Sequence, residues 1–593
     1  MPLIVLGALL QGAVGYSGAS VQNTPQMKTP TSTTPEKDKC TVSGVVTSLQ
    51  TGEPLKKATL HLTLRNTSRN TSGVFEQTGY SGTSGPDGSF KFESVEPGEY
   101  ALSGEKPGYI RTSYGSKNGM TGGTMINLST GQQLTDLKMQ LVAQATITGR
   151  VLDDDGDPVS GVMVQALGRM FVQGGKARYF PRGSGNTDDT GSYRIHNLTP
   201  GKYYILAQSN RNQMMGLRER PAEPGKPVMQ PVRTFYPSSL DRTGASALDL
   251  KAGQEMPGVD IRQRSLETFH IRGKVAGDLP ETEGRMNMLT IMPNDSGEVG
   301  MMYNNMTMIA KDHTFDIANV APGTYIITMP NFNGGKQTAR QSVEVSSGDV
   351  NDVVITPQQA FVIHGAVELQ GKLSGNAKDK ALESIYVTLQ PDDVNMMMGA
   401  TQATTKADGS FTLETVVPSK YRVNVYNEPD GAYVKSIRFG SQETLGKTLD
   451  LSQAGGGELH VILGAGAAEV TGTVMKQQDS SATSSSNSAS VPVSGASVIL
   501  IPEDLTRNGG SVHRAGTNQN GGFDEKGLTP GVYYALAFEA DEYRSFDDPA
   551  ILKQLVDKGT RVEVKENDKQ QLQVTLTPAE EIQAALAASG VDN

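Results

Sequence analysis

Residues 87–100 read DGSFKFESVEPGEY, and four looser copies of this phrase follow along the 593-residue chain. The copies read DTGSYRIHNLTPGKYY, DHTFDIANVAPGTY, DGSFTLETVVPSKY and NGGFDEKGLTPGVYY. In every copy a proline lies three residues before a tyrosine, and an aromatic residue lies ten before it. The tyrosines are Tyr100, Tyr203, Tyr325, Tyr421 and Tyr533, separated by 103, 122, 96 and 112 residues. Intervals of this size suit one small β domain per copy.

The order of residue types in the phrase is typical of a hairpin. Asp-Gly or Asn-Gly tolerates the positive φ angles of a tight turn, and the alternation in Phe90-Lys91-Phe92 places one face of a strand in a core. Pro-Gly then reverses the chain, and the tyrosine begins the next strand. We therefore expect each tyrosine ring to be buried while its hydroxyl binds a neighbouring backbone group.

A second phrase opens every copy, with a glycine between two aliphatic residues at alternate positions. Its five versions are Val42-x-Gly44-x-Val46, Ile147-x-Gly149-x-Val151, Ile271-x-Gly273-x-Val275, Ile363-x-Gly365-x-Val367 and Val470-x-Gly472-x-Val474. The alternation predicts a strand, and a glycine inside a strand predicts a bulge or the close approach of another backbone. In addition, stretches such as TGQQLTDLKMQL suggest a final hairpin centred on Gly131 and, in the second copy, on Gly253. Together these phrases predict an all-β chain of five tandem β-sandwiches.

The domain boundaries follow from these phrases. We expect sandwiches at residues 40–143, 144–266, 267–358, 359–466 and 467–578, the second with long loop inserts. The serine-rich stretch 477–490 interrupts the fifth sandwich as a surface insertion. Residues 579–593 are expected to form a short tail helix, because Thr577, Pro578 and Glu580 have the pattern of an N-cap, a first-turn proline and a capping box.

The start of the chain favours export. Residues 3–14 are mostly apolar, and Ser17 and Ala19 are small residues at which a signal peptidase could cut, although no Lys or Arg precedes the apolar run. Residues 1–19 are therefore interpreted as a signal peptide and residues 20–39 as a Thr/Pro-rich linker. No later stretch reaches the ~18 apolar residues of a membrane helix. We expect a secreted, periplasmic or cell-surface protein.

Charge and cysteine content exclude several classes of partner. The formal net charge of -10 argues against nucleic acid and anionic membranes, which require a basic surface. The single cysteine, Cys40, allows neither an intrachain disulfide nor a thiolate metal cage. We therefore expect no cofactor and no metal site.

The two phrases resemble the carboxypeptidase regulatory-like domain, a transthyretin-like (prealbumin-like) β-sandwich. The resemblance covers residues ~40 to 578 in five copies. The third copy has His313 in place of the turn glycine, and the fourth has Ser419 in place of the glycine after proline. The resemblance implies the fold of Ig-like sandwiches and a folding, adhesion or interaction role in bacterial exported proteins; it implies no activity.

No catalytic motif accompanies the resemblance. A zinc peptidase needs paired histidines and an acidic ligand, and the seven histidines include no HExxH or HxxE pair. The densest carboxylate cluster, residues 153–157, has two interpretations, a calcium-stiffened loop or a bare turn rich in Asp and Gly, and the turn is favoured. The chain is expected not to be an enzyme.

The inserts of the second copy hold the candidate binding residues Tyr179, Phe180, Phe235 and Tyr236. Aromatic rings stack on sugars and on protein side chains, so these four could form a ligand surface; alternatively they cover the edge of the sandwich. Two functions remain open. The first is an exported, non-enzymatic scaffold or adhesion-like module with an unknown protein or glycan partner at the cell envelope. The second is a carbohydrate-binding protein that uses these rings.

Overall fold

The computed structural model describes residues 34–588 apart from fifteen internal gaps. The gaps are residues 66–77, 117–118, 120–122, 172–176, 210–227, 278, 280–286, 295–304, 330–336, 374–381, 393–400, 454–455, 478–489, 506–511 and 540–548. The expected signal peptide, most of the linker and nearly all of the serine-rich insertion lie outside the described residues.

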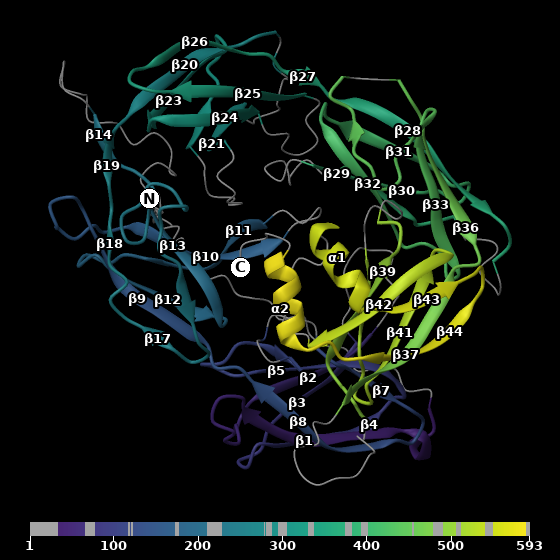
Figure 1. Cartoon of the computed structure of the whole chain (residues 1–593). Helices are drawn as coiled ribbons and strands as arrows, with labels where there is room; N and C mark the ends of the chain where they lie inside the picture. Colours follow the sequence, from purple (N-terminus) through teal and green to yellow (C-terminus); the bar gives the residue numbers. More distant parts are fainter. Residues whose placement is uncertain are drawn as a thin grey trace, which may run out of the picture.

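Five buried hydrophobic clusters follow one another along the chain, each between two sheets of short strands, so the all-β tandem fold is confirmed. Figure 1 shows the five sandwiches arranged in a ring, coloured from purple to yellow. We number them as domains 1 to 5.

Domains 1 and 2 contain the following elements. Domain 1 has η1 (Glu36–Asp38), β1 (Cys40–Ser48), β2 (Thr59–Leu64), β3 (Gly79–Thr83), β4 (Ser89–Val95), β5 (Gly98–Glu105), β6 (Thr112–Ser113), β7 (Met125–Leu128) and β8 (Gln133–Leu141). Domain 2 has β9 (Ala145–Leu152), β10 (Val162–Phe171), β11 (Ala177–Asn186), β12 (Ser192–Leu198), β13 (Gly201–Ser209), β14 (Met229–Pro231), β15 (Thr234–Phe235), β16 (Leu248–Leu250), β17 (Glu255–Met256), β18 (Ile261–Arg262) and β19 (Ser265–Glu267).

Domains 3 to 5 contain the remaining elements. Domain 3 has β20 (Phe269–Val275), β21 (Met288–Pro293), β22 (Asn305–Met308), β23 (Thr314–Val320), β24 (Gly323–Met329), β25 (Gln337–Val345), β26 (Val350–Ile355) and β27 (Gln358–Gln359). Domain 4 has β28 (Phe361–Gln370), β29 (Tyr386–Pro391), β30 (Thr401–Thr404), β31 (Ser410–Val416), β32 (Lys420–Tyr426), β33 (Ala432–Phe439), β34 (Gln442–Glu443), β35 (Leu449–Asp450) and β36 (Leu459–Ala465). Domain 5 has β37 (Ala468–Gln477), β38 (Ser490–Pro492), β39 (Ala496–Pro502), β40 (His513–Gly516), β41 (Gly522–Leu528), β42 (Gly531–Glu539), α1 (Pro549–Leu555), η6 (Val556–Lys558), β43 (Thr560–Val564), β44 (Lys569–Thr575) and α2 (Ala579–Ala588).

The repeated phrase is not a hairpin, so that prediction is wrong. In domain 1, β4 pairs with β1 in one sheet, whereas β3 and β5 pair with β2 in the other. The Asp-Gly and Pro-Gly turns therefore each carry the chain from one sheet to the other. The expected final hairpin at Gly131 is wrong for the same reason, since β7 pairs with β5 and β8 with β1. Alternation reports which face of a strand is buried, but it does not report which strand is its neighbour.

The repeated tyrosine closes the corner after the repeated proline in all five domains, including domain 4, where Ser419 replaces the glycine of the Pro-Gly pair. Its hydroxyl donates to the backbone oxygen four residues earlier, over 2.7 to 2.9 Å. Tyr325 is half-buried, and the other four rings are at most 2% exposed. These contacts confirm the predicted hydrogen bond to the backbone. The physical reason is that a tyrosine ring buried between two sheets has no water near its hydroxyl, so the hydroxyl needs a partner within the protein.

The first-strand glycine lies against the backbone of a later segment of the same domain. That segment is β8, β26, β36 and β44 in domains 1, 3, 4 and 5, and the stretch around Val259, between β17 and β18, in domain 2. A Cβ atom added at any of the five glycines would lie closer than 3.0 Å to a backbone oxygen of that neighbouring segment. In domains 1 and 3 the parallel register shifts at this point, between Val42 and Gly44 and between Ile271 and Gly273. The predicted close backbone approach is confirmed.

Two helices cover the outer face of one sheet of domain 5. The expected tail helix is present as α2, while α1 was not expected from the sequence. Side chains of both helices, including Ile551, Leu552 and Ile582, are buried against Ile499 and Phe538 of the sheet. Figure 1 shows this helix pair inside the ring. None of the helices in the described part of the chain is long and apolar enough to cross a membrane.

Domain 5 contacts domain 1 and so closes the ring. The side-chain amide of Gln519 accepts a hydrogen bond from the backbone N–H of Asn127 (3.1 Å) and donates one to its backbone oxygen (2.8 Å). Gly495 lies beside Thr124 and Gly115 of domain 1, since a Cβ added there would be 2.9 Å from the Thr124 hydroxyl. Gln519 stands at a turn position that is Pro86 in domain 1 and Ala407 in domain 4, so this contact is particular to the fifth copy.

Candidate functional site

The aromatic candidates of domain 2 lie on different surfaces. Phe235, in β15, is fully buried and packs with Leu167 and Leu206 on the outer face of the sheet, and Tyr179 packs against this cluster. Tyr236 packs against the sandwich core instead. Phe180 follows Tyr179 in β11, so strand alternation directs it to the opposite face. The structure thus brings together two of the four rings, and Phe235 is shielded from solvent.

An arginine completes the outer cluster. The Arg242 guanidinium lies 4.0 Å from the ring centre of Tyr179 and 5.4 Å from that of Tyr204, and the two rings meet edge to face at 5.5 Å. Arg242 and Tyr204 were not among the predicted residues. An arginine shortly after Phe235 was a visible signal, but only the fold places it over a ring from β11. We call Tyr179, Tyr204 and Arg242 the stacked cluster.

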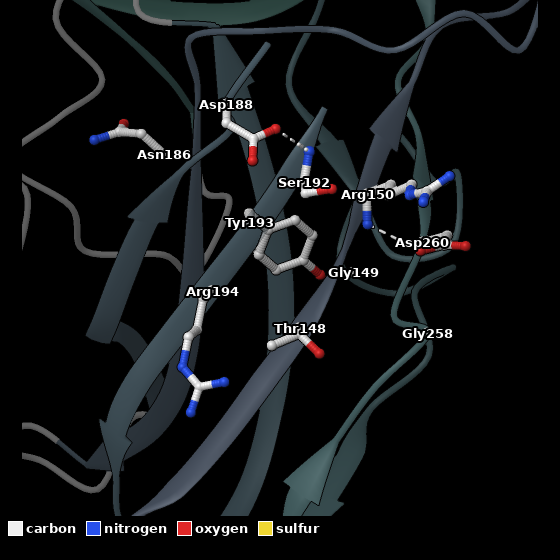
Figure 2. Close-up of a pocket in the computed structure, with 10 residues that line it drawn as sticks. All are labelled: Thr148, Gly149, Arg150, Asn186, Asp188, Ser192, Tyr193, Arg194, Gly258 and Asp260. Atoms are coloured by element: carbon white, nitrogen blue, oxygen red, sulfur yellow. Dashed lines mark hydrogen bonds between the residues drawn. The ribbon is translucent and has the colours of Figure 1, made fainter. Parts of the chain in front are cut away.

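A hollow of about 660 Å³ lies on the other sheet of domain 2, beside β9 and β12 (Figure 2). Tyr193 forms part of its lining, but its hydroxyl donates to the Val259 backbone oxygen at 2.6 Å. Asp260 accepts the backbone N–H of Arg150 at 2.9 Å. Asp188 accepts the hydroxyl of Thr190 at 2.7 Å, and such hydrogen bonds hold the pKa of its carboxyl below the usual value. The polar groups of Tyr193, Asp260 and Asp188 therefore already form hydrogen bonds within the protein.

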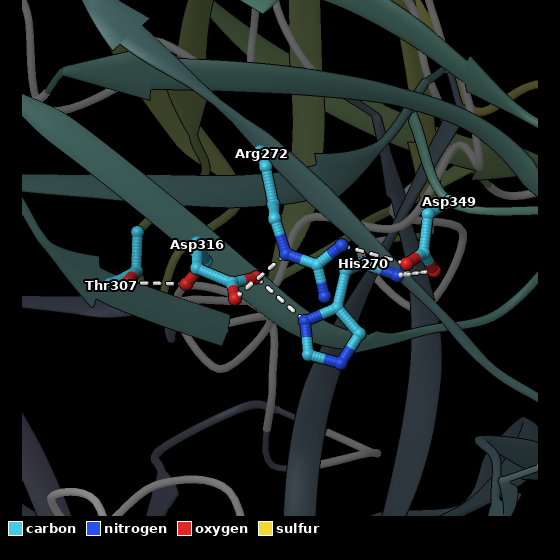
Figure 3. A network of polar contacts seen from close by, with 5 residues as sticks. All are labelled: His270, Arg272, Thr307, Asp316 and Asp349. Atoms are coloured by element: carbon cyan, nitrogen blue, oxygen red, sulfur yellow. Dashed lines mark hydrogen bonds and ion pairs between the residues drawn. The ribbon is translucent and has the colours of Figure 1, made fainter. Parts of the chain in front are cut away.

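A polar network on domain 3 links three segments (Figure 3). Arg272 on β20 binds Asp316 on β23 (3.1 Å) and Asp349 just before β26 (2.7 Å). His270 Nδ1 lies 2.7 Å from Asp316, and its backbone N–H donates to Asp349. The two carboxylates raise the pKa of Arg272, and the hydrogen bond from the His270 backbone, with the nearby Arg272, lowers that of Asp349. The network therefore links β20, β23 and the residue that precedes β26, and these three strands form one sheet.

The carboxylates of residues 153–157 act within a turn. Asp153 accepts the backbone N–H groups of Asp155 (3.0 Å) and Asp157 (2.9 Å). Asp154 pairs with Arg264 at 3.3 Å. No group of three or more His, Cys, Asp or Glu side chains within the described ranges is arranged to hold a metal ion. This geometry favours the turn interpretation over the calcium loop.

Residues 41–142 match the family model of the carboxypeptidase regulatory-like domain. The first sandwich is therefore similar to the regulatory-like domains over almost its whole length. The other four repeat its tyrosine corner, its crossed glycine and its pairing of the first strand with the strand before the Pro-Gly corner. The chain is therefore a tandem of sandwiches with the architecture of that regulatory-like domain.

Three solved structures with detectable similarity come from Bacillus anthracis, Streptococcus agalactiae and Staphylococcus aureus. The Bacillus anthracis TIE protein is 13% identical, over 54% of this chain and 51% of that one, with a TM-score of 0.15. The minor pilin GBS52 of Streptococcus agalactiae is 13% identical, over 41% and 99%, with a TM-score of 0.21. Two B repeats of the Staphylococcus aureus collagen-binding protein are 12% identical, over 72% and 100%, with a TM-score of 0.12. Scores this low carry no conclusion about function. No curated protein matches the chain.

Proposed function

We propose that this protein is an exported, non-enzymatic scaffold that presents interaction surfaces at the cell envelope. The supporting observation is that residues shared by all copies and residues found in a single copy have different roles. The groups common to all copies, the corner tyrosine and the crossed glycine, are used by the fold. The stacked cluster lies in domain 2, and the described residues of the other four domains show no counterpart to it. This pattern is expected of a scaffold, in which the same fold is repeated and the surface residues that contact partners differ between domains.

Export and partner choice can be tested in the native cells. We expect the full chain in the secreted, periplasmic or surface fraction, starting after residue 19. Crosslinking in intact cells followed by mass spectrometry should recover an envelope protein or glycan through domain 2. A cytoplasmic location with an uncut N-terminus would contradict the proposal. Turnover of peptides or glycans by the purified chain would contradict the absence of enzymatic activity.

The second candidate function is carbohydrate binding by the aromatic residues of domain 2. It is supported by the partial exposure of Tyr179 and Tyr236, each of which leaves ring surface open to a ligand. A glycan array probed with the full chain tests it. Sugar binding that is lost in Tyr236→Ala or Tyr179→Ala, but kept in the exposed control Tyr426→Ala of domain 4, would favour this function. An array without any specific binding would remove it.

A further inference from the structure

A cavity of about 940 Å³ lies at the joint between domains 4 and 5. This volume is in the range of pockets that hold small organic molecules. The joint is tied on both sides by backbone hydrogen bonds. The N–H groups of Gly466 and Ala467 both donate to the Gly431 oxygen at 2.8 Å, and the N–H of Asn567 donates to the Gly466 oxygen at 2.8 Å. These hydrogen bonds hold the segments that line the cavity in place.

One wall of the cavity is apolar. Val425 on β32, Val434 on β33 and Leu445 line it, and all three are only partly buried where they pack against the domain 4 core. The open end of the domain 4 sandwich thus leaves aliphatic surface facing the cavity. Covering that surface with an apolar group would be favourable by about 25 cal/mol per Å².

Glu428 lines the same cavity just beyond the end of β32. Its side chain is half-buried, and within the described ranges no other residue donates a hydrogen bond or forms an ion pair with its carboxylate. Burial raises the pKa of this carboxyl, which is opposed by its own backbone N–H and by the nearby His513. A partly buried carboxylate that forms no ion pair is a group that a cationic ligand would stabilise.

The cations of domain 5 that reach the cavity are already paired within domain 5. Lys569 binds Glu469 at 2.9 Å, and Lys526 lies 3.2 Å from Asp524 and 3.8 Å from Glu469. The two remaining basic side chains of the lining form no ion pair with Glu428 either. They are His513, which lies 3.2 Å from Glu525, and Lys372 of domain 4. Glu428 is thus left with its charge unmatched.

We propose that the cavity binds an organic ammonium or guanidinium compound with an apolar body. The cationic head lies beside the carboxylate of Glu428, and the body covers Val425, Val434 and Leu445. The ligand class follows from placing one unmatched carboxylate next to an aliphatic wall. This proposal stands apart from the stacked cluster of domain 2, so either can fail without the other.

The test uses three probes of equal length on the full chain, namely hexylamine, hexanoic acid and hexanol, at neutral pH by calorimetry or NMR titration. A hydrogen bond to a charged group contributes about 1.5–3 kcal/mol, so hexylammonium should bind roughly ten- to a hundredfold more tightly than the other two. Glu428→Gln keeps the shape of the side chain and should remove that preference. The control Glu414→Gln, an exposed carboxylate on β31, should keep it.

A second variant tests the apolar wall independently. Val434→Thr preserves the volume of the side chain and should weaken hexylammonium by a few-fold, while shorter ethylamine should bind wild type and variant alike. Equal affinity for hexylammonium and hexanoate would overturn the proposal. So would undiminished binding to Glu428→Gln, or no detectable binding of hexylammonium at about 10 mM.

Discussion

The corner of domain 4 and the outer face of domain 2 use tyrosines in opposite ways. Tyr421 is fully buried and donates its hydroxyl to the Val417 backbone, as its counterparts do in every domain. Tyr179 is half-buried and stacks on Arg242, an arrangement found in domain 2. The difference shows that residue type alone does not identify a binding residue. Its recurrence at a fixed place in every copy marks a role in the fold.

The largest effect is expected at the crossed glycine. Gly273→Ala would push a methyl group into the Val353 backbone oxygen, so we expect a loss of about 3 kcal/mol or more in the stability of domain 3. The matched control is Gly348→Ala in the same domain, where an added Cβ meets nothing within 4 Å. Chemical denaturation of both variants makes the comparison. Equal stability of the two variants would contradict the structural role of the glycine.

The corner tyrosine should make domain 4 sensitive to alkaline pH. Burial raises the pKa of Tyr421 to about 12, whereas an unfolded tyrosine has a pKa of about 10. Between these values the folded state retains a proton that the unfolded state has lost, so stability falls as the pH rises. Tyr421→Phe should cost roughly 1–3 kcal/mol at pH 8, and this deficit should shrink above pH 10.

Calorimetry at several pH values checks this expectation. Tyr426→Phe, on the same strand and 54% exposed, serves as the control and should match wild type throughout. A deficit for Tyr421→Phe that stays constant between about pH 8 and 12 would show that the buried hydroxyl does not titrate as described.

The stacked cluster should contribute less. Arg242→Ala removes two contacts between a cation and a ring and is expected to destabilise domain 2 by about 1 kcal/mol. Arg262→Ala, an exposed arginine of the same domain, should cost less. Thermal melting compares the two. If Arg242→Ala leaves stability unchanged but abolishes capture of a partner, the cluster serves recognition and not folding.

The smallest effect on stability is expected at the contact between domains 5 and 1. Gln519→Ala removes two hydrogen bonds at an exposed site, where a substitution usually changes stability by about 0.5 kcal/mol or less. The radius of gyration from small-angle X-ray scattering should nevertheless increase. Gln442→Ala, an exposed glutamine of domain 4, should leave it unchanged. A wild-type chain as extended as the variant would mean that the ring is open in solution.

The sequence was sufficient to predict the sandwiches and the roles of their common residues. The spacing around Tyr100 and its counterparts predicted five cores, and Gly44 and its counterparts predicted close backbone contact. It did not predict strand partners, because Asp-Gly and Pro-Gly turns look the same whether the chain stays in one sheet or crosses to the other. The helix α1 was missed because its apolar residues matter only against the outer face of a sheet.

The candidate site was less predictable for a related reason. Phe235 was visible as an aromatic residue in an insert, but its complete burial depends on β13 and on residues of β10. Arg242 and the joint around Glu428 depend on segments that are distant in sequence or in different domains. Such sites arise from the packing of elements, which composition and periodicity do not encode.

The contact between Gln519 and Asn127 has a mechanical consequence. When linearly connected domains are stretched, the whole force passes through every domain in turn. In a chain closed between its first and fifth domains, part of the force passes through the contact between those two domains instead. Among the described residues, this shorter path passes through the two hydrogen bonds of Gln519 and the contact of Gly495 with Thr124. Under tension these bonds would part before any sandwich unfolds, so the molecule would lengthen while all five cores stay intact.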